Sequence, residues 1–290
     1  SNRFLSSYPN YLYFIVRLEE MCFTSEDNIW VVKCMIRKAL VLAAGKGTRL
    51  MPITRAIPKE MIRVGLKPAI EHVIEVLKAG GIKEILVIVG KKKESIMDHL
   101  GSGEEFGVNI YYKVQEEPKG TAHAVLQGRD FIGSEDFVVI YGDNYFKPYQ
   151  SMKEILAFHE EHGADVTLVL HPVIDPRRYG IVRIDGEGNV LRMIEKPSLE
   201  EAEFYRVEGR LLSIAGLLVL NDSIFEAIKE TQVGRDGEVW LTDTVEILRM
   251  SGSRVLGYIF NGIRYDIGTF ESLLEADRLE LRDRQLNDKK

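Results

Sequence analysis

A turn with two glycines and two basic residues follows the apolar run Lys38–Ala43. Gly45 and Gly47 permit a tight turn that points several backbone N–H groups toward an anion. Lys46 and Arg49 add positive charge, and a guanidinium can bind phosphate oxygens through two hydrogen bonds. The spacing therefore predicts a phosphate-binding loop, with a plain strand-to-helix turn as the alternative for an isolated G-x-G.

Established fingerprints exclude several other kinds of site. A dinucleotide-binding loop needs a third glycine where Leu50 stands, and a Walker A loop needs Ser or Thr where Gly47 follows Lys46. Lys91 stands where a nicotinamide-dependent oxidoreductase would want an acidic ribose ligand. The sequence contains no G-x-S-x-G and no H-E-x-x-H, so neither a serine hydrolase nor a zincin is supported. His159-x-x-His162 is interpreted as part of a solvated helix face.

Four charged side chains stand close to the ends of predicted strands or turns. Lys59 follows a proline, Asp143 ends the strand Asp136–Tyr141, and Lys196 and Asp266 each follow a strand. Ligands of open parallel sheets bind beyond the carboxyl ends of the strands, and Mg²⁺ prefers carboxylates together with substrate phosphate oxygens. These residues therefore predict a cation-assisted anion site. The alternatives are a solvated surface lysine and an ordinary Asp-Asn turn.

Strand and helix patterns alternate along most of the chain, which predicts β-α-β units around a mainly parallel sheet. After about residue 172 the pattern changes to a hairpin around the turn 186–189, followed by further strands and helices. We expect strands at 38–43, 84–89, 108–114, 136–141, 165–170, 179–184, 190–195, 211–220 and 255–260, and helices at 69–78, 91–100, 121–127, 152–162, 222–229, 242–250 and 269–284.

Composition separates the first 34 residues from the rest of the 290-residue chain. All 25 glycines lie from Gly45 onward, whereas both cysteines, Cys22 and Cys34, and seven aromatic residues lie in the first 34. We therefore expect an N-terminal extension of unknown role over residues 1–34 and one α/β domain over residues 35–290. We also expect the extension to be dispensable for activity.

Charge and hydropathy exclude other classes of protein. The formal net charge of -6 argues against a nucleic-acid partner, which usually demands a basic excess. No apolar run reaches the roughly 18 residues that a membrane span needs. Two cysteines without a C-x-x-C spacing form neither a disulfide framework nor a zinc site. We expect a cytoplasmic protein without a membrane partner, and a homo-oligomer.

Eight segments, in order, resemble the sugar-1-phosphate nucleotidylyltransferase family. The resemblance covers nearly all of residues 35–290 and is closest to the UTP–glucose-1-phosphate uridylyltransferases and the glucose-1-phosphate thymidylyltransferases. Its segments are LAAGKGTRL (42–50), Pro58-Lys59, KVQEEPKGTAHA (113–124), GDN (142–144), YGIV (179–182), EKP (195–197), GEVWLTD (237–243) and YDIG (265–268).

The resemblance implies a Rossmann-like three-layer α/β/α nucleotidyltransferase fold, with a mixed, mostly parallel central sheet and a small additional β portion. It implies direct in-line attack of a hexose 1-phosphate, with glucose 1-phosphate expected, on the α-phosphorus of UTP, giving a UDP-sugar and pyrophosphate. A dTTP-dependent thymidylyltransferase is the alternative, because uracil and thymine present the same hydrogen-bonding edge. From a different class, a non-catalytic nucleotide-sensing relative is a further alternative.

The resemblance also implies a role for each site residue. Mg²⁺ is the expected cofactor, held by Asp143 and Asp266, and Lys59 is expected near the reacting phosphates. Lys196 is expected to bind the sugar phosphate, and Arg49 the departing pyrophosphate. The nucleotide-binding set is Ala43, Ala44, Gly45, Gly47, Thr48, Gln115 and Gly120; the sugar-binding set is Tyr179, Gly180, Glu195 and Ile214. Gly234-Arg235-Asp236 departs from the thymidylyltransferase pattern, whose basic residue is displaced here.

Overall fold

The computed structural model describes residues 21–23, 30–32, 36–91, 94–234 and 236–287. By its internal contacts the chain divides into two compact units, Ser1–Met35 and Ile36–Lys290. In the smaller unit, the described residues form an antiparallel pair of β1 (Met21–Phe23) and β2 (Trp30–Val32), in which Cys22 lies opposite Val31. The rest of that unit lies outside the described residues, so the predicted role of residues 1–34 stays a prediction.

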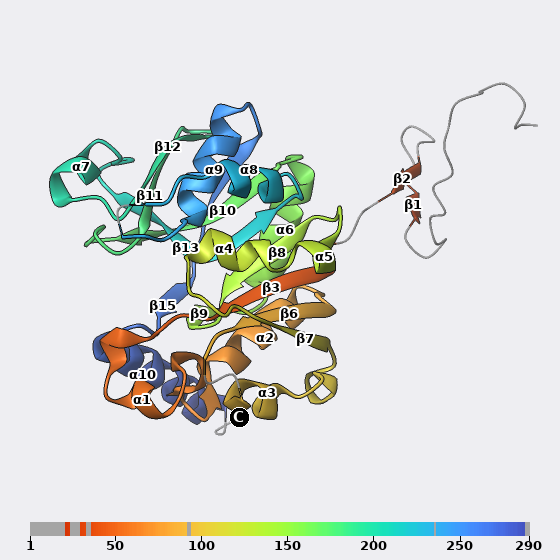
Figure 1. Cartoon of the computed structure of the whole chain (residues 1–290), viewed down its shortest axis with the longest axis vertical. Coiled ribbons are helices and arrows are strands. Elements are labelled where there is room, and N and C mark those ends of the chain that lie inside the picture. The colour runs from red at the N-terminus through yellow and green to blue at the C-terminus, as the bar shows by residue number, and fades with distance from the viewer. Residues whose placement is uncertain (1–20, 24–29, 33–35, 92–93, 235, 288–290) are drawn as a thin grey trace, which may run out of the picture. The chain divides into compact units, whose positions relative to one another are not determined.

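The larger unit is built around a nine-stranded sheet, shown in Figure 1. Four neighbouring parallel strands lie in the order β8 (Phe137–Tyr141), β3 (Lys38–Ala43), β6 (Glu84–Val89) and β7 (Asn109–Val114). Their carboxyl ends meet at one edge of the sheet. The predicted phosphate loop, Gly142-Asp143-Asn144 and Gln115 all begin at that edge.

The other half of the sheet is mixed. β13 (Leu211–Leu220) runs antiparallel to β8 and to β10 (Val166–Val173), and β10 pairs in parallel with β14 (Val255–Ile259). The hairpin of β11 (Gly180–Ile184) and β12 (Val190–Glu195) joins the edge of β13. The expected fold, a mixed and mostly parallel sheet between helices with an additional β portion, is confirmed.

Two apolar clusters on opposite faces of the sheet make up the core. Along β3, Leu40 and Leu42 belong to one cluster, whereas Val41 and its alternate neighbours belong to the other, as the two-residue period of a strand requires. The first cluster is covered by α4 (Thr121–Leu126), α5 (Arg129–Ile132), α8 (Ile224–Glu230) and α9 (Leu241–Met250). The second is covered by α2 (Ala69–Ala79), α3 (Glu94–Leu100) and α6 (Ser151–Glu161), which gives three layers.

A small two-stranded ladder, which the sequence patterns did not predict, lies beside the site edge. β9 (Asn144–Lys147) pairs antiparallel with β15 (Ile263–Asp266), and Asp266 lies opposite Asn144. This ladder brings the segment after β8 together with a segment more than 100 residues later. The remaining described elements of this unit are η2 (Thr48–Leu50), α1 (Ile53–Ala56), η3 (Lys59–Met61), β4 (Arg63–Val64), β5 (Lys67–Pro68), η4 (Glu104–Phe106), α7 (Leu199–Glu203) and α10 (Phe270–Asn287).

Two sequence-based interpretations are wrong in detail. His159 is buried, not solvated: its exposed fraction is 1%, and its Nδ1 lies 2.8 Å from the hydroxyl of Thr167 on β10. The helix expected from Lys91 begins at Glu94, and residues 92–93 lie outside the described part of the chain. The cause at His159 is the apolar face of α6, which packs the ring against the sheet.

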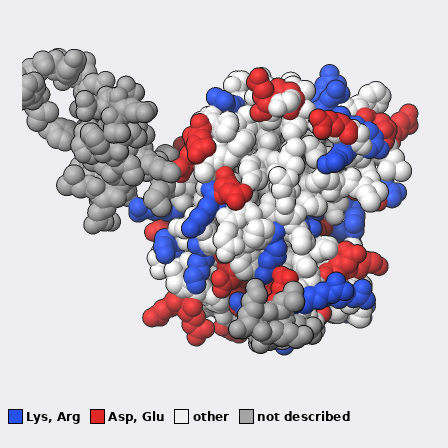
Figure 2. All heavy atoms as spheres, turned by 180° about the vertical axis from the view of Figure 1, so that it is seen from behind, with Lys and Arg blue, Asp and Glu red and all other residues white. Residues whose placement is uncertain are grey.

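The described surface carries mixed charge. On the face shown in Figure 2, Lys and Arg side chains are interspersed with Asp and Glu side chains around uncharged areas. Among the described helices, none has the length and apolar character needed to cross a lipid bilayer.

Candidate active site

One cavity of about 440 Å³ lies at the carboxyl ends of the parallel strands. Every predicted site residue except Ala43 lines it. Ala43 is buried at the end of β3, in the cluster beneath α2 and α6, so its side chain belongs to the core. The lining residues are Ala44, Gly45, Gly47, Thr48, Arg49, Lys59, Gln115, Gly120, Asp143, Tyr179, Gly180, Glu195, Lys196, Ile214 and Asp266.

The loop after β3 is held by close contacts at its two glycines. Gly47 has a left-handed φ of 63°, and its carbonyl oxygen accepts a hydrogen bond of 2.8 Å from the Thr54 hydroxyl. A Cβ on Gly45 would lie 3.1 Å from Cε of Lys59. A larger residue at position 45 would therefore displace the end of the Lys59 side chain, and one at position 47 would crowd Thr54.

Lys59 and Asp143 form an ion pair at the centre of the site. The Lys59 ammonium donates a hydrogen bond to Oδ2 of Asp143, and the Asp143 side chain is almost fully buried. Burial by itself would lower the pKa of Lys59, but the neighbouring carboxylates of Asp143 and Glu60 outweigh it and raise that pKa above its ordinary value. Lys59 is therefore a permanent cation at neutral pH.

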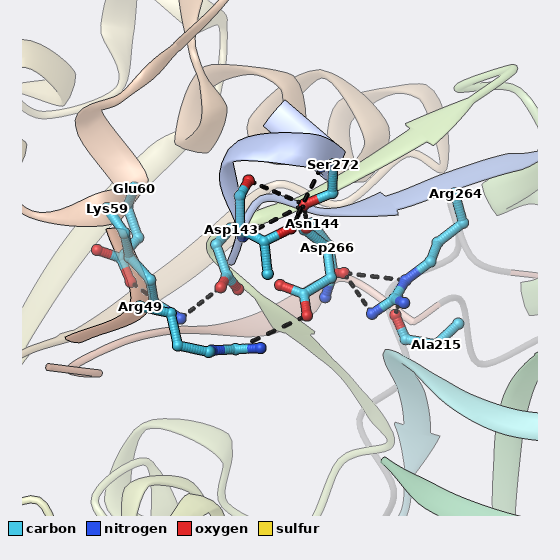
Figure 3. A network of polar contacts seen from close by, with 10 residues as sticks. Arg49, Lys59, Glu60, Asp143, Asn144, Ala215, Arg264, Asp266 and Ser272 are labelled. Atoms are coloured by element: carbon cyan, nitrogen blue, oxygen red, sulfur yellow. Dashed lines mark hydrogen bonds and ion pairs between the residues drawn. The ribbon is translucent and has the colours of Figure 1, made fainter. Parts of the chain in front are cut away.

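Asp266 approaches Asp143 through the β9–β15 ladder. The Ile267 amide donates a 2.9 Å hydrogen bond to the Asp143 carbonyl oxygen, so the two carboxylates are carried by adjoining backbone segments (Figure 3). Among the described residues, no group of three or more His, Cys, Asp or Glu side chains is arranged to hold a metal. Two carboxylates beside an open cavity nevertheless fit Mg²⁺, which usually binds one or two carboxylates and completes its shell with phosphate oxygens and water.

Arg49 reaches across the cavity to Asp266. Its Nη2 lies 3.9 Å from Oδ2 of Asp266, and about half of its side chain is exposed to the cavity and solvent. Gly268 makes this approach possible, since a Cβ there would lie 2.6 Å from Asp266 Oδ1 and 2.8 Å from Arg49 Nη2. The guanidinium is thus loosely held and accessible to an anion.

Gln115 and Gly120 lie together on another wall of the cavity. Gln115 is buried, and its Nε2 lies 2.7 Å from Nδ1 of His123. Gly120 has φ of 107°, and a Cβ there would meet the Val239 carbonyl oxygen at 2.3 Å. The end of this loop at Gly120 therefore lies directly against the Val239 backbone, whose amide also donates a 2.8 Å hydrogen bond to the Lys119 carbonyl oxygen.

Polar groups on the β11–β12 hairpin line a further wall. Glu195 lies opposite Gly180 across the hairpin, and its Oε2 accepts a 2.6 Å hydrogen bond from the Thr242 hydroxyl. Burial raises the pKa of Glu195 to about 7, although the Thr242 hydrogen bond and Lys196 oppose that rise. A Cβ on Gly180 would lie within about 3 Å of both Glu195 and Thr242, so only glycine leaves this wall open.

Lys196 is held by two side chains from the segment before α9. Its ammonium lies 3.0 Å from Oδ2 of Asp236 and 3.5 Å from the ring centroid of Trp240. The Trp240 indole N–H donates a 2.9 Å hydrogen bond to the other Asp236 oxygen. Arg235, the basic residue that is displaced relative to thymidylyltransferases, lies outside the described residues.

Sequence reasoning missed several residues of the site. Asn144 Oδ1 accepts hydrogen bonds from Arg264 at 2.9 and 3.2 Å, and Arg264 also binds the Ala215 carbonyl oxygen (Figure 3). Glu60 lies behind Lys59 with an exposed fraction of 0%. Asn144 belongs to the GDN motif and Glu60 follows Lys59 directly, and these positions were the only signals for them; Arg264 had the weaker signal of standing two positions before Asp266.

Comparison with known proteins identifies the family. The model of the nucleotidyl transferase family matches residues 38–283. The chain belongs to this nucleotidyl transferase family. The predicted resemblance to sugar-1-phosphate nucleotidylyltransferases, and the prediction of an enzyme of that type, are thereby confirmed.

Individual nucleotidyl transferases are similar over most of the chain. A UTP–glucose-1-phosphate uridylyltransferase of Staphylococcus saprophyticus is 34% identical over 80% of this chain and 88% of its own length. A glucose-1-phosphate thymidylyltransferase of Streptomyces griseus is 34% identical over 84% of this chain and 66% of its own. The crystal structure of a UDP-glucose pyrophosphorylase complexed with UDP-glucose has a TM-score of 0.77 and 30% identity, covering 86% of this chain and 100% of that one.

Proposed function

We propose that this nucleotidyl transferase transfers the uridylyl group of UTP to a hexose 1-phosphate, with glucose 1-phosphate as the acceptor. A phosphate oxygen of the sugar phosphate forms a new bond to the α-phosphorus of UTP. The bond from that phosphorus to the bridging oxygen breaks, and the electron pair leaves with pyrophosphate. The observation that carries the proposal is one cavity with Arg49, Lys59 and Asp143 on one wall and Glu195 and Lys196 on another.

The glycine loop and Arg49 suit the leaving group. Backbone N–H groups from Gly45 to Thr48 can donate hydrogen bonds to the β- and γ-phosphates, and the loosely held Arg49 guanidinium can bind their oxygens through two hydrogen bonds. Both interactions stabilise charge that grows on the departing pyrophosphate, which is where an enzyme of this kind gains most of its rate.

Lys59, Asp143 and Asp266 suit the reacting phosphates. Lys59 remains positively charged and lies at the cavity wall, where it can stabilise the α-phosphate oxygens. We propose that Asp143 and Asp266 hold a Mg²⁺ ion. When bound, that ion supplies charge neutralisation at the α-phosphate. The direct displacement needs no covalent nucleophile on the protein. Lys59, Asp143 and Asp266 act through their charges, and none of them is required to form a covalent intermediate.

The hairpin wall suits the sugar. Glu195 is kept in place by Thr242 and can accept hydrogen bonds from sugar hydroxyl groups. Tyr179, Gly180 and Ile214 complete this wall, and Lys196 can bind the sugar phosphate after leaving Asp236. Gln115 and the Gly120 backbone, with Ala44 alongside, would bind the pyrimidine edge; Ala43 contributes from beneath as a core residue.

A dTTP-dependent reaction is the second candidate. A thymidylyltransferase is among the similar proteins, and thymine presents to Gln115 the same edge as uracil. The segment Gly234-Arg235-Asp236 favours UTP, because the basic residue of the thymidylyltransferase pattern is displaced in this chain.

A substrate matrix tests the proposal. The protein is incubated with Mg²⁺, each of UTP, dTTP, CTP, ATP and GTP, and each of glucose, N-acetylglucosamine and galactose 1-phosphates, and pyrophosphate release is measured. We expect the highest kcat/KM with UTP and glucose 1-phosphate. A higher value with dTTP would replace the uridylyl assignment, and nucleotide binding in thermal-shift assays without turnover of any pair would overturn the proposal.

A further inference from the structure

Glu60 is a buried carboxylate behind the reacting centre whose oxygens lack hydrogen-bond partners. Its side chain is fully buried, and neither Oε1 nor Oε2 has a hydrogen-bond partner among the described residues. It does not line the cavity. Its nearest ionic neighbour is the Lys59 ammonium, 3.9 Å from Oε1, which lies between Glu60 and Asp143 in Figure 3.

Such a group is costly to keep. A buried charge without hydrogen bonds is one of the most destabilising features that a protein interior can contain, and a methionine of similar size would avoid the cost. Burial accordingly raises the pKa of Glu60 to about 7, with Lys59 opposing the rise. The wall behind it is also closed, because a Cβ on Gly142 would lie 3.1 Å from Cγ of Glu60.

Lys59 is bound to the carboxylate oxygen that would ligate a metal ion. Its ammonium is hydrogen-bonded to Oδ2 of Asp143, and Asp143 is one of the two carboxylates proposed to hold Mg²⁺. A divalent cation and an ammonium repel each other at such a distance, so binding of the cation requires Lys59 to turn away. In a buried setting the displaced ammonium needs another anion at once.

We propose that Glu60 is the alternate ion-pair partner of Lys59: when a divalent cation binds Asp143, the ammonium moves from Asp143 to Glu60. The proposal rests on the proposed function in one respect, namely that Asp143 binds the cation. Glu60 is then a positioning residue. Once the metal is bound to Asp143, Glu60 keeps Lys59 charged and beside the cavity. The two oxygens of Glu60, which have no other hydrogen-bond partner among the described residues, then accept hydrogen bonds from the ammonium.

A double-mutant cycle on metal binding tests this role. Mn²⁺ serves as the probe, and its dissociation constant is measured by electron paramagnetic resonance on the wild-type protein, Glu60→Gln, Lys59→Met and the double variant, without nucleotide or sugar. In the presence of Lys59 we expect Glu60→Gln to weaken Mn²⁺ binding by about tenfold, within the range of coupling between residues of one ion-pair network. In the Lys59→Met background we expect the same change to alter binding by less than about twofold, near the error of such cycles.

The double-mutant cycle distinguishes movement of the Lys59 ammonium from Asp143 to Glu60 from two simpler roles of Glu60. Equal weakening by Glu60→Gln in both backgrounds would mean that Glu60 acts only through its charge, and no weakening in either would mean that it acts only in packing; both results overturn the proposal. Should Lys59→Met not fold, Lys59→Gln closes the cycle. Wild-type protein that binds no Mn²⁺ would overturn the proposed metal site together with this inference, whereas coupled Mn²⁺ binding without turnover would overturn only the proposed reaction.

Thermal unfolding gives a second readout. In the absence of metal, Glu60→Met replaces a buried carboxylate that has no hydrogen bonds by an apolar side chain of similar size, so we expect this variant to melt at a higher temperature than the wild-type protein. A more stable protein that binds metal less well is the signature of a positioning residue. A less stable one would assign Glu60 to the support of the fold and contradict the inference.

Discussion

Lys59 and Asp143, which are 84 positions apart in the sequence, meet through a charged hydrogen bond at the end of β8. The lysine is carried by the turn η3 and the aspartate by the carboxyl end of a core strand. Neither side chain is fixed by its own segment alone; each is held by the other and by the closed wall around Glu60. The centre of the site therefore consists of opposite charges from different segments, placed where a metal ion and substrate phosphates could bind.

Removing the charge of Asp143 should remove most of the activity. We expect Asp143→Asn to lower turnover by at least ~10²-fold, the usual loss for one charge interaction made in the transition state. The matched control is Asp130→Asn, an exposed carboxylate on α5 that is remote from the cavity lining. Steady-state pyrophosphate release measures both, and near-wild-type turnover of Asp143→Asn would exclude Asp143 from the site.

A methyl group at Gly268 should damage the site without unfolding the protein. The Cβ of Gly268→Ala would lie 2.6 Å from Asp266 and 2.8 Å from Arg49, so both side chains must move. Because misplacement of about 1 Å can cost ~10²-fold in rate, we expect a loss of that order in kcat. Gly186→Ala, whose Cβ would meet no atom within 4 Å, should retain full activity. Equal activity of the two variants would show that Arg49 and Asp266 need no fixed position.

Release of Lys196 should strengthen binding of the sugar phosphate. Asp236 competes with that phosphate for the ammonium, and the pair is partly exposed. An exposed ion pair contributes roughly 0.2–1 kcal/mol, so we expect Asp236→Asn to lower KM for glucose 1-phosphate by a factor between about 1.4 and about 5. Glu203→Gln, which breaks the exposed pair with Arg206, should leave KM unchanged. An increase of KM in Asp236→Asn would mean that Asp236 positions Lys196 for the substrate.

The pKa of Glu195 predicts how stability depends on pH. Burial raises that pKa from 4.5 to about 7, so the folded protein binds more protons than the unfolded chain between these values. The stabilising effect of the protonated form is complete below about pH 4.5 and is lost as pH rises through about 7. Glu195→Gln cannot lose a proton, so its unfolding free energy should fall less than that of the wild-type protein from pH 5 to pH 8. Parallel pH profiles from denaturant titrations would contradict this assignment.

Residues 1–34 should not contribute to catalysis. All of the inferred chemistry lies between Ala44 and Asp266, and the family match begins at residue 38. We expect a chain that starts at Met35 to keep the kcat and KM of the full chain. A large loss of turnover in the shortened protein would show that the N-terminal extension is an integral part of the enzyme.

Much of this architecture is predictable because its signals are local. A buried strand such as Glu84–Val89 is predicted by its continuous apolar run. The glycines at 45 and 47 indicate a turn that few other residues could form. The meeting of Asp143 with Asp266 has no such signal, since it depends on the four-residue strands β9 and β15, which pair across more than 100 residues. A position at the carboxyl end of a strand predicts that a side chain lies at the edge of the sheet where the cavity is. It does not predict which other side chain it contacts there.

Burial was the other quantity that the sequence could not provide. His159 and Glu60 are polar residues in segments whose patterns allow exposure, and both lie fully inside the protein. The Nδ1 of His159 is hydrogen-bonded to Thr167, and its Nε2 lies 3.6 Å from Asp136 without a hydrogen bond among the described residues. Both oxygens of Glu60 lack hydrogen bonds among the described residues and lie beside Lys59. Only the packed structure shows which buried polar atoms have a partner and which do not.

Pyrophosphate release from UTP and glucose 1-phosphate in the presence of Mg²⁺ is the decisive measurement for the proposed reaction. We expect one pyrophosphate for each UDP-glucose formed, a higher kcat/KM with UTP than with dTTP, and no release once Mg²⁺ is chelated. Absence of pyrophosphate with every pairing of nucleoside triphosphate and hexose 1-phosphate would contradict the proposed reaction.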